Sequence, residues 1–147
     1  MLDFELYTPT KIFFGRGRCD EVGKVVAAYG CRKPLISYGG GSARRSGLLG
    51  RVEVSLRDAG LDFAELGGVR ANPTVEFCAE TASYAREQGC DFVIGLGGGS
   101  SIDSAKSIAV MAKNPGDYWD YISGGSGKGQ PLVNGALPIV AIATTAG

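Results

Sequence analysis

The chain has 147 residues, of which 44% are hydrophobic and 20% are charged, a composition typical of globular domains. Its 15 Lys and Arg residues balance its 15 Asp and Glu residues, so we expect neither nucleic acid nor an anionic membrane as a partner. No apolar run approaches the roughly 20 residues that cross a bilayer, and the N-terminus carries acids where a secretory signal carries bases. These features predict a cytoplasmic location.

The chain contains no histidine, which removes the commonest general base and the commonest metal ligand. A Ser-His-Asp hydrolase or a histidine-ligated metal enzyme therefore cannot be built from these residues alone. The cysteines form no CxxC pair, and their pattern is typical of small buried apolar residues: Cys19, Cys31, Cys78 and Cys90. We expect no catalytic and no metal-ligating residue in this chain.

The first half of the chain predicts a hairpin followed by alternating helices and strands. Residues 4–7 and 11–14 flank the turn former Pro9 and predict a short N-terminal β-hairpin. Apolar spacing of three, four and seven residues predicts a helix over 19–29. The further elements of this half are a strand at 34–38, a helix at 46–59 and a strand at 61–66.

The second half continues the alternation. After a turn at 71–76, the pattern predicts a helix at 74–88, a strand at 91–96, a helix at 101–113 and a strand at 136–143. Residues 116–135 form a polar, glycine-rich stretch that predicts an exposed loop, a candidate lid or partner contact. This order predicts an α/β fold with a doubly wound, mostly parallel Rossmann-like sheet. We expect residues 1–147 to form one dinucleotide-binding domain.

Glycine is enriched, with 24 residues in 147 against a usual share of about 7%. Residues 30–42 and 89–100 share a plan in which a glycine, a cysteine and an apolar strand lead to GGGS. Glycines at a strand end let backbone amides converge where no Cβ obstructs, and a following helix adds partial positive charge. Two such anion-binding loops on neighbouring strands predict a dinucleotide held where the strand order reverses.

The second of these segments continues as GGGSSIDSAK over residues 97–106. Ser100 is placed to cap the helix, with Asp103 three residues on as in a capping box. Lys106 follows three residues later, so the alternative is an ordinary surface ion pair between Asp103 and Lys106. The pattern is neither a Walker A loop nor the spaced GxGxxG fingerprint.

Five segments, in order, resemble the iron-containing, or group III, alcohol dehydrogenases, and the likeness covers essentially the whole chain. They are YGGGSARRSGLL (38–49), ANPTVE (71–76), GGGSSIDSAK (97–106), DYWDY (117–121) and PIVAIATTAG (138–147). The resemblance, closest to the butanol dehydrogenase branch, implies hydride transfer between an alcohol and a nicotinamide dinucleotide, giving an aldehyde or ketone.

The resemblance also implies which residues contact the cofactor. They are, in chain order, Gly39, Gly40, Gly41, Ser42, Asn72, Gly98, Gly99, Ser100, Asp103, Thr144 and Thr145. Those of the second GGGS segment would lie at the pyrophosphate and adjoining groups, and Asn72 would lie along the nucleotide. The two threonines match family residues near the phosphates and the nicotinamide end.

Position 39 bears on the choice between NAD and NADP in this family, where an Asp there accepts hydrogen bonds from the adenosine ribose. Gly39 removes a carboxylate that would repel a 2′-phosphate, and Ser42 or Arg44 could donate to that phosphate. We therefore expect NADP(H), with NAD(H) as the alternative. Arg44 and Arg45 are otherwise two solvated surface charges.

Two departures from the family pattern qualify the resemblance. Ala143 stands where the family usually has Pro, which loosens the turn without removing its donors. Beyond TTAG the family continues into a helical domain that carries the Asp and His ligands of iron or another divalent metal. We therefore expect a fragment that binds the cofactor, is inactive alone, packs against that C-terminal domain, and forms a homodimer through its N-terminal strands.

Two other functions stay open at this point. One is a freestanding nucleotide-binding or assembly module without chemistry. The other keeps the fold but has the chemistry of the glycerol dehydrogenases, maleylacetate reductases or dehydroquinate synthases. The TTAG ending and the DYWDY segment favour the alcohol dehydrogenases over these relatives.

Overall fold

The computed structural model describes residues 3, 5–114 and 116–145. Four strands form one sheet in the order β2-β1-β3-β4, and every neighbouring pair is parallel. The strands are β1 (Pro34–Gly39), β2 (Ala64–Val69), β3 (Phe92–Gly97) and β4 (Ile139–Ala143). Parallel neighbours need long crossovers, which the helices supply. The predicted doubly wound α/β fold is confirmed.

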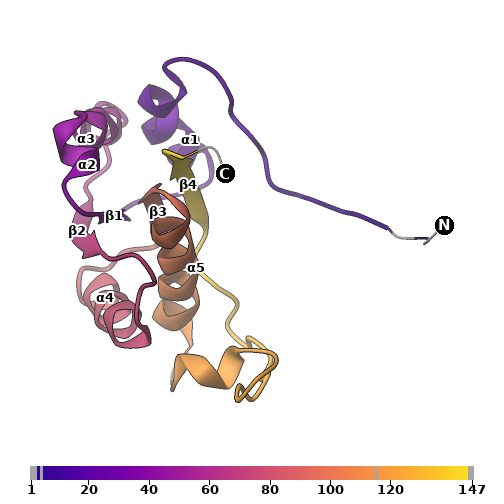
Figure 1. Cartoon of the computed structure of the whole chain (residues 1–147). Helices are drawn as coiled ribbons and strands as arrows, with labels where there is room; N and C mark the ends of the chain where they lie inside the picture. The colour runs from indigo at the N-terminus through magenta and orange to yellow at the C-terminus, as the bar shows by residue number, and fades with distance from the viewer. Residues whose placement is uncertain (1–2, 4, 115, 146–147) are drawn as a thin grey trace.

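Helices cover both faces of the sheet (Figure 1). They are η1 (Arg18–Glu21), α1 (Val22–Ala28), α2 (Ser42–Arg45), α3 (Leu48–Asp58), α4 (Val75–Glu87), α5 (Gly99–Lys113) and η2 (Tyr118–Tyr121). On one face, α1 and α3 pack against Ile36 and Ile94; on the other, α4 and α5 pack against Leu35 and Val93. Successive side chains of a strand point to opposite faces, so β1 and β3 each contribute to both cores.

The sequences of the two central strands are continuous apolar runs because both faces of these strands are buried. From Pro34 to Tyr38 and from Phe92 to Leu96, every residue is buried, as expected where helices cover both faces of a parallel sheet. The edge strand β4 alternates between exposed and half-buried residues instead. Among the described helices, none is long and apolar enough to span a membrane.

The predicted N-terminal hairpin is wrong for the residues that the structure describes. Residues 5–14 form no strand and run away from the sheet (Figure 1), while Phe4 lies outside the described residues. Leu6, Tyr7, Ile12 and Phe14 are 74%, 83%, 81% and 94% exposed. An isolated two-stranded hairpin is at best marginally stable in water, and this segment packs against no further strand. The sheet is therefore parallel throughout the described chain.

Two elements begin at other residues than predicted, and a glycine lies at each difference. The helix predicted at 46–59 is α3 (Leu48–Asp58); a separate helical turn, α2, precedes it, and Gly47, with a φ of 74°, lies between the two. The strand predicted at 61–66 lies at 64–69 and passes through Gly67. A Cβ at Gly67 would stand 2.6 Å from the Tyr38 ring, so this glycine makes room for an aromatic side chain of the neighbouring strand.

The glycine-rich stretch at 116–135 is a closed loop rather than an extended one. Buried Asn114 ties its two ends together, because its Nδ2 donates to Val110 O (2.8 Å) and to Gly135 O (2.7 Å). Within the loop, Trp119 Nε1 donates to Ser126 Oγ at 2.7 Å. Its predicted role as a lid or partner contact stays a prediction. Pro115 lies outside the described residues.

Candidate functional site

The two glycine-rich segments lie at the carboxyl ends of the two central strands. After β1 the chain turns toward α2 and α3 on one face of the sheet, and after β3 it turns toward α5 on the other. The strand order therefore reverses between β1 and β3 (Figure 1). In open α/β sheets, ligands bind outside the carboxyl ends of the strands at this switch point.

The second glycine segment begins the long helix α5 without a side-chain cap. Gly97 has a φ of 146°, Gly98 is the extended N-cap residue, and the helix begins at Gly99. Gly98 has no side chain that could cap the helix, and no described side chain accepts from its first turn, so the amides of Gly99 and Ser100 lie uncapped at the positive end of the helix dipole. This arrangement suits a phosphate.

The predicted capping box is wrong. Ser100 lies inside the first turn of α5, because the extended backbone of Gly98 already provides the N-cap position. Asp103 lies one turn further and accepts from Lys106 Nζ at 3.1 Å on the exposed side of the helix. The alternative surface ion pair is therefore present.

Ser101 links the two glycine segments, and the sequence reasoning missed it. Its side chain is 4% exposed, and a Cβ at Gly97 would stand 2.5 Å from Ser101 Oγ. A Cβ at Gly39 would stand 3.5 Å from the same oxygen. Gly97 is required here, because Ser101 fills the space that a side chain would need, whereas at Gly39 the same oxygen lies at an ordinary van der Waals distance. Its position on the buried side of α5 was the available signal.

The threonines after β4 lie beside the second glycine segment. The Thr144 amide donates to Gly97 O at 2.9 Å, which extends the β3–β4 pairing past the end of the sheet. A Cβ at Gly98 would stand 3.4 Å from Thr145 Oγ1, so the Thr145 side chain lies next to the backbone of Gly98. Ala146 and Gly147, the end of the TTAG motif, lie outside the described residues.

The first glycine segment is not equivalent to the second. Gly39 ends β1, Gly40 has open space where a Cβ would be, and Gly41 is the N-cap of α2. Ser42 is the first residue of α2, which has only four residues and therefore a weak dipole. Of the two predicted anion-binding loops, one therefore leads into a long helix and the other into a single helical turn.

Asn72 lies in the turn between β2 and α4, three residues after Val69, which pairs with Gly39. It is the non-glycine residue with a positive φ, 55°, among the described residues. The turn delivers Thr74, whose Oγ1 accepts from Phe77 N at 3.2 Å and caps α4. Asn72 lines an open pocket of about 480 Å³ that also includes Arg70 and Glu76.

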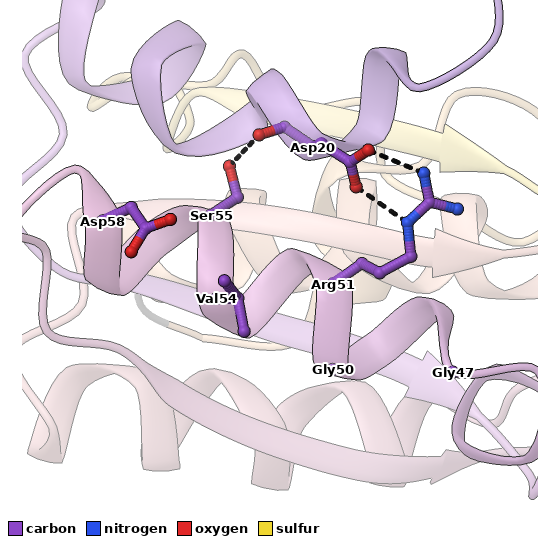
Figure 2. A pocket seen from close by; sticks show the side chains of 7 residues that line it. All are labelled: Asp20, Gly47, Gly50, Arg51, Val54, Ser55 and Asp58. Atoms are coloured by element: carbon purple, nitrogen blue, oxygen red, sulfur yellow. Dashed lines mark hydrogen bonds and ion pairs between the residues drawn. The ribbon is translucent and has the colours of Figure 1, made fainter.

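A second pocket, of about 420 Å³, lies between η1 and α3, away from the glycine segments (Figure 2). Arg51 donates to both carboxylate oxygens of Asp20, at 2.7 and 2.8 Å. Ser55 Oγ donates to Asp20 O at 2.6 Å and accepts from Gly23 N at 2.9 Å. These contacts hold η1 and α1 against α3, so we interpret the pocket as structural.

The described residues fit a dinucleotide better than a metal. Among them, no group of three or more His, Cys, Asp or Glu side chains could hold a metal ion. Burial raises the pKa of the Cys31 thiol to about 12, helped by the neighbouring Asp91 carboxylate, so this cysteine stays protonated and is a poor ligand. By contrast, no atom lies within 4 Å of a Cβ placed at Gly99, the first residue of α5, which leaves space for a phosphate at the start of this helix.

Comparison with known proteins tests the resemblance directly. A family model described as iron-containing alcohol dehydrogenase matches residues 9–147. NADH-dependent butanol dehydrogenase A of Clostridium acetobutylicum is 39% identical over 144 residues, which are 98% of this chain and 36% of that protein. The NADPH-dependent aldehyde reductase YqhD of Escherichia coli is 34% identical over 146 residues, again 98% of this chain and 36% of that protein.

Solved structures agree with the sequence comparison. The crystal structure of NADH-dependent butanol dehydrogenase A from Thermotoga maritima matches with a TM-score of 0.89 and 37% identity, covering 97% of this chain and 34% of that one. The chain thus spans about a third of the length of these relatives. Because the family model covers nearly every residue, the predicted resemblance is confirmed, and the chain belongs to the iron-containing alcohol dehydrogenase family.

Proposed function

We propose that this chain binds a nicotinamide dinucleotide across the carboxyl ends of β1 and β3. It would thereby supply the cofactor-binding part of a dehydrogenase that interconverts alcohols with aldehydes or ketones. The observation that carries the proposal is the N-terminus of α5, which no side chain of its N-cap residue caps and whose first amide belongs to the third of three consecutive glycines. A pyrophosphate placed there would accept from the Gly99 and Ser100 amides.

The other predicted site residues would orient the two ends of the nucleotide. Thr144 and Thr145 lie beside Gly98 and would face the phosphates and the nicotinamide. The Gly39–Ser42 segment and Asn72 would lie along the adenosine. Asp103, on the exposed side of α5, pairs with Lys106 through Oδ1, and its other carboxylate oxygen would accept from adjoining cofactor groups. The bound cofactor accepts or donates the hydride, and the chain's own residues hold it in place.

We propose a preference for NADP(H) over NAD(H). The support is Gly39, which leaves the end of β1 without a carboxylate that would repel a 2′-phosphate. The names of the relatives include both cofactors, since the butanol dehydrogenases are called NADH-dependent and the aldehyde reductase NADPH-dependent. The preference of this chain is therefore a matter for direct measurement.

The remaining parts of the proposal concern partners and location. With no metal ligand set among the described residues, the chain would hold the nucleotide while a further domain, as in its longer relatives, would complete the active site. The exposed apolar residues of segment 5–14 would pair with a second copy, giving a homodimer. A cytoplasmic location stays a prediction from composition.

The test is a titration of the 147-residue chain with NADPH and NADH, followed by nucleotide fluorescence. Gly99→Asp places a carboxylate where the pyrophosphate would lie, and no atom lies within 4 Å of the added Cβ. A carboxylate in the first turn stabilises a helix, so this variant should melt at or above the wild-type temperature and yet bind at least tenfold more weakly. Gly50→Asp is the matched control, because Gly50 lies in the first turn of α3 with equally open space.

Three results would contradict the proposal. Wild-type chain that binds neither nucleotide would favour the freestanding assembly module, especially if its size on a sizing column rose with concentration. Equal weakening by Gly99→Asp and Gly50→Asp would place the nucleotide elsewhere. Alcohol oxidation above background by the chain alone, with any divalent metal added, would show that it needs no further domain.

A further inference from the structure

Two consecutive arginines follow the first glycine segment, and the structure separates their roles. We infer that Arg45, and not Arg44, is the specificity-determining residue that recognises the adenosine 2′-phosphate of NADP(H). This inference rests on the nucleotide binding proposed above.

Arg44 is already engaged by its own chain. Its Nη2 donates to the Tyr38 hydroxyl and to Glu65 Oε1, the latter at 3.2 Å, and its guanidinium lies over the Tyr38 ring at 5.2 Å. The hydrogen bond to Tyr38, with the charge of Glu65 nearby, raises the pKa of Arg44. Glu65 Oε2 is buried and has no partner of its own. Removing Arg44 would leave that carboxylate without its cation, so Arg44 is held in place.

Arg45 has the opposite surroundings. Among the described residues, no acidic side chain forms an ion pair with it, although eight such pairs involve other residues. Its backbone amide donates to Gly41 O at 2.8 Å, so the single turn of α2 fixes its position relative to the glycine segment. Arg45 is exposed, and its charge is available to a ligand.

The guanidinium of Arg45 lies directly against Gly41. A Cβ at Gly41 would stand 3.2 Å from Arg45 Cζ and would collide with Nη1. Because Gly41 has an ordinary negative φ, its backbone does not require glycine. The guanidinium of Arg45 thus lies beside the third glycine of the segment, at the end of an exposed side chain that can turn toward a ligand.

The placement of this cation matches the cofactor that carries an extra phosphate. With the pyrophosphate at the start of α5, an adenosine directed toward β1 and β2 would bring its ribose to the Gly39–Ser42 segment. A planar guanidinium donates two parallel hydrogen bonds to a phosphate, whereas a ribose hydroxyl offers it no charge. Arg45 therefore acts on NADP(H) and leaves the affinity for NAD(H) almost unchanged.

The experiment compares Arg45→Gln with Arg44→Gln, its neighbour on the same turn. The dissociation constants of NADPH, NADH, adenosine 2′,5′-bisphosphate and adenosine 5′-monophosphate are measured for both variants and the wild type. We expect Arg45→Gln to weaken the two ligands with a 2′-phosphate at least tenfold and to change the other two less than twofold. Arg44→Gln should leave the ratio of NADPH to NADH affinity within twofold of wild type, and circular dichroism checks that both variants fold.

Each other outcome overturns the inference. Equal weakening of all four ligands by Arg45→Gln would give Arg45 a general electrostatic role, and no change would give it none. Selective loss of NADPH binding in Arg44→Gln would assign the phosphate to Arg44. Wild-type chain that binds NADH and not NADPH would refute phosphate recognition while leaving the proposed nucleotide site intact. Binding of neither nucleotide would refute the proposed function itself, and the inference with it.

Discussion

Gly23 lies at the closest approach of two helices, and replacing it with alanine should destabilise the protein. The added Cβ would stand 2.6 Å from the carbonyl carbon of Ser55 and even closer to the carbonyl oxygen of Ser55, so it would collide with both atoms. Both obstacles are backbone atoms of α3, so they cannot rotate away, and α1 must shift. The same glycine donates its N–H to Ser55 Oγ, a hydroxyl that also donates to Asp20 O.

The expected change in the free energy of unfolding combines two destabilising contributions and one stabilising contribution. Overpacking costs about 1–3 kcal/mol, and weakening the two Ser55 hydrogen bonds costs about 0.5–1.5 kcal/mol each. Alanine favours the helix over glycine by about 0.5–1 kcal/mol. The net loss is therefore about 1 kcal/mol or more, and each kcal/mol lowers the melting temperature of a chain of this size by about 2–4 °C.

Urea unfolding followed by circular dichroism measures the change in the free energy of unfolding. Gly50→Ala is the control, because Gly50 lies in α3 with no atom within 4 Å of the added Cβ. That variant should gain about 0.5–1 kcal/mol from helix propensity alone. If Gly23→Ala proved as stable as the wild type, the close contact between α1 and α3 would be refuted.

Two further variants test local features. Partial burial raises the pKa of the Asp91 carboxyl, but the Lys33 and Arg32 amides and the Arg32 guanidinium outweigh it, so the folded-state pKa is lowered. Asp91→Asn should cost about 1–3 kcal/mol at pH 7, and this difference should shrink as pH falls through that pKa; a pH-independent difference would contradict it. Asn72→Gly should keep the melting temperature, whereas Asn72→Val should lose about 1–2 kcal/mol; equal melting of both would contradict strain at φ 55°.

Local patterns in the sequence identified most of the fold. The apolar runs at 34–38 and 91–96 became the buried central strands β1 and β3, and the Thr74 turn became the start of α4. These predictions succeeded because periodicity and capping depend on neighbouring residues. The N-terminal hairpin failed because two short strands need a third partner to be stable, which a local pattern cannot supply.

The candidate site divides in the same way. Local sequence patterns predicted that two glycine-rich loops follow two apolar strands and that the chain resembles one family of dehydrogenases. The folded chain shows how the helices after the two loops differ, since α2 has four residues and α5 has fifteen. The fold also pairs Arg44 on α2 with Glu65 on β2, 21 residues away, while no acidic side chain among the described residues forms an ion pair with Arg45. Such contacts depend on which strands become neighbours in the sheet, and a local sequence pattern does not show this.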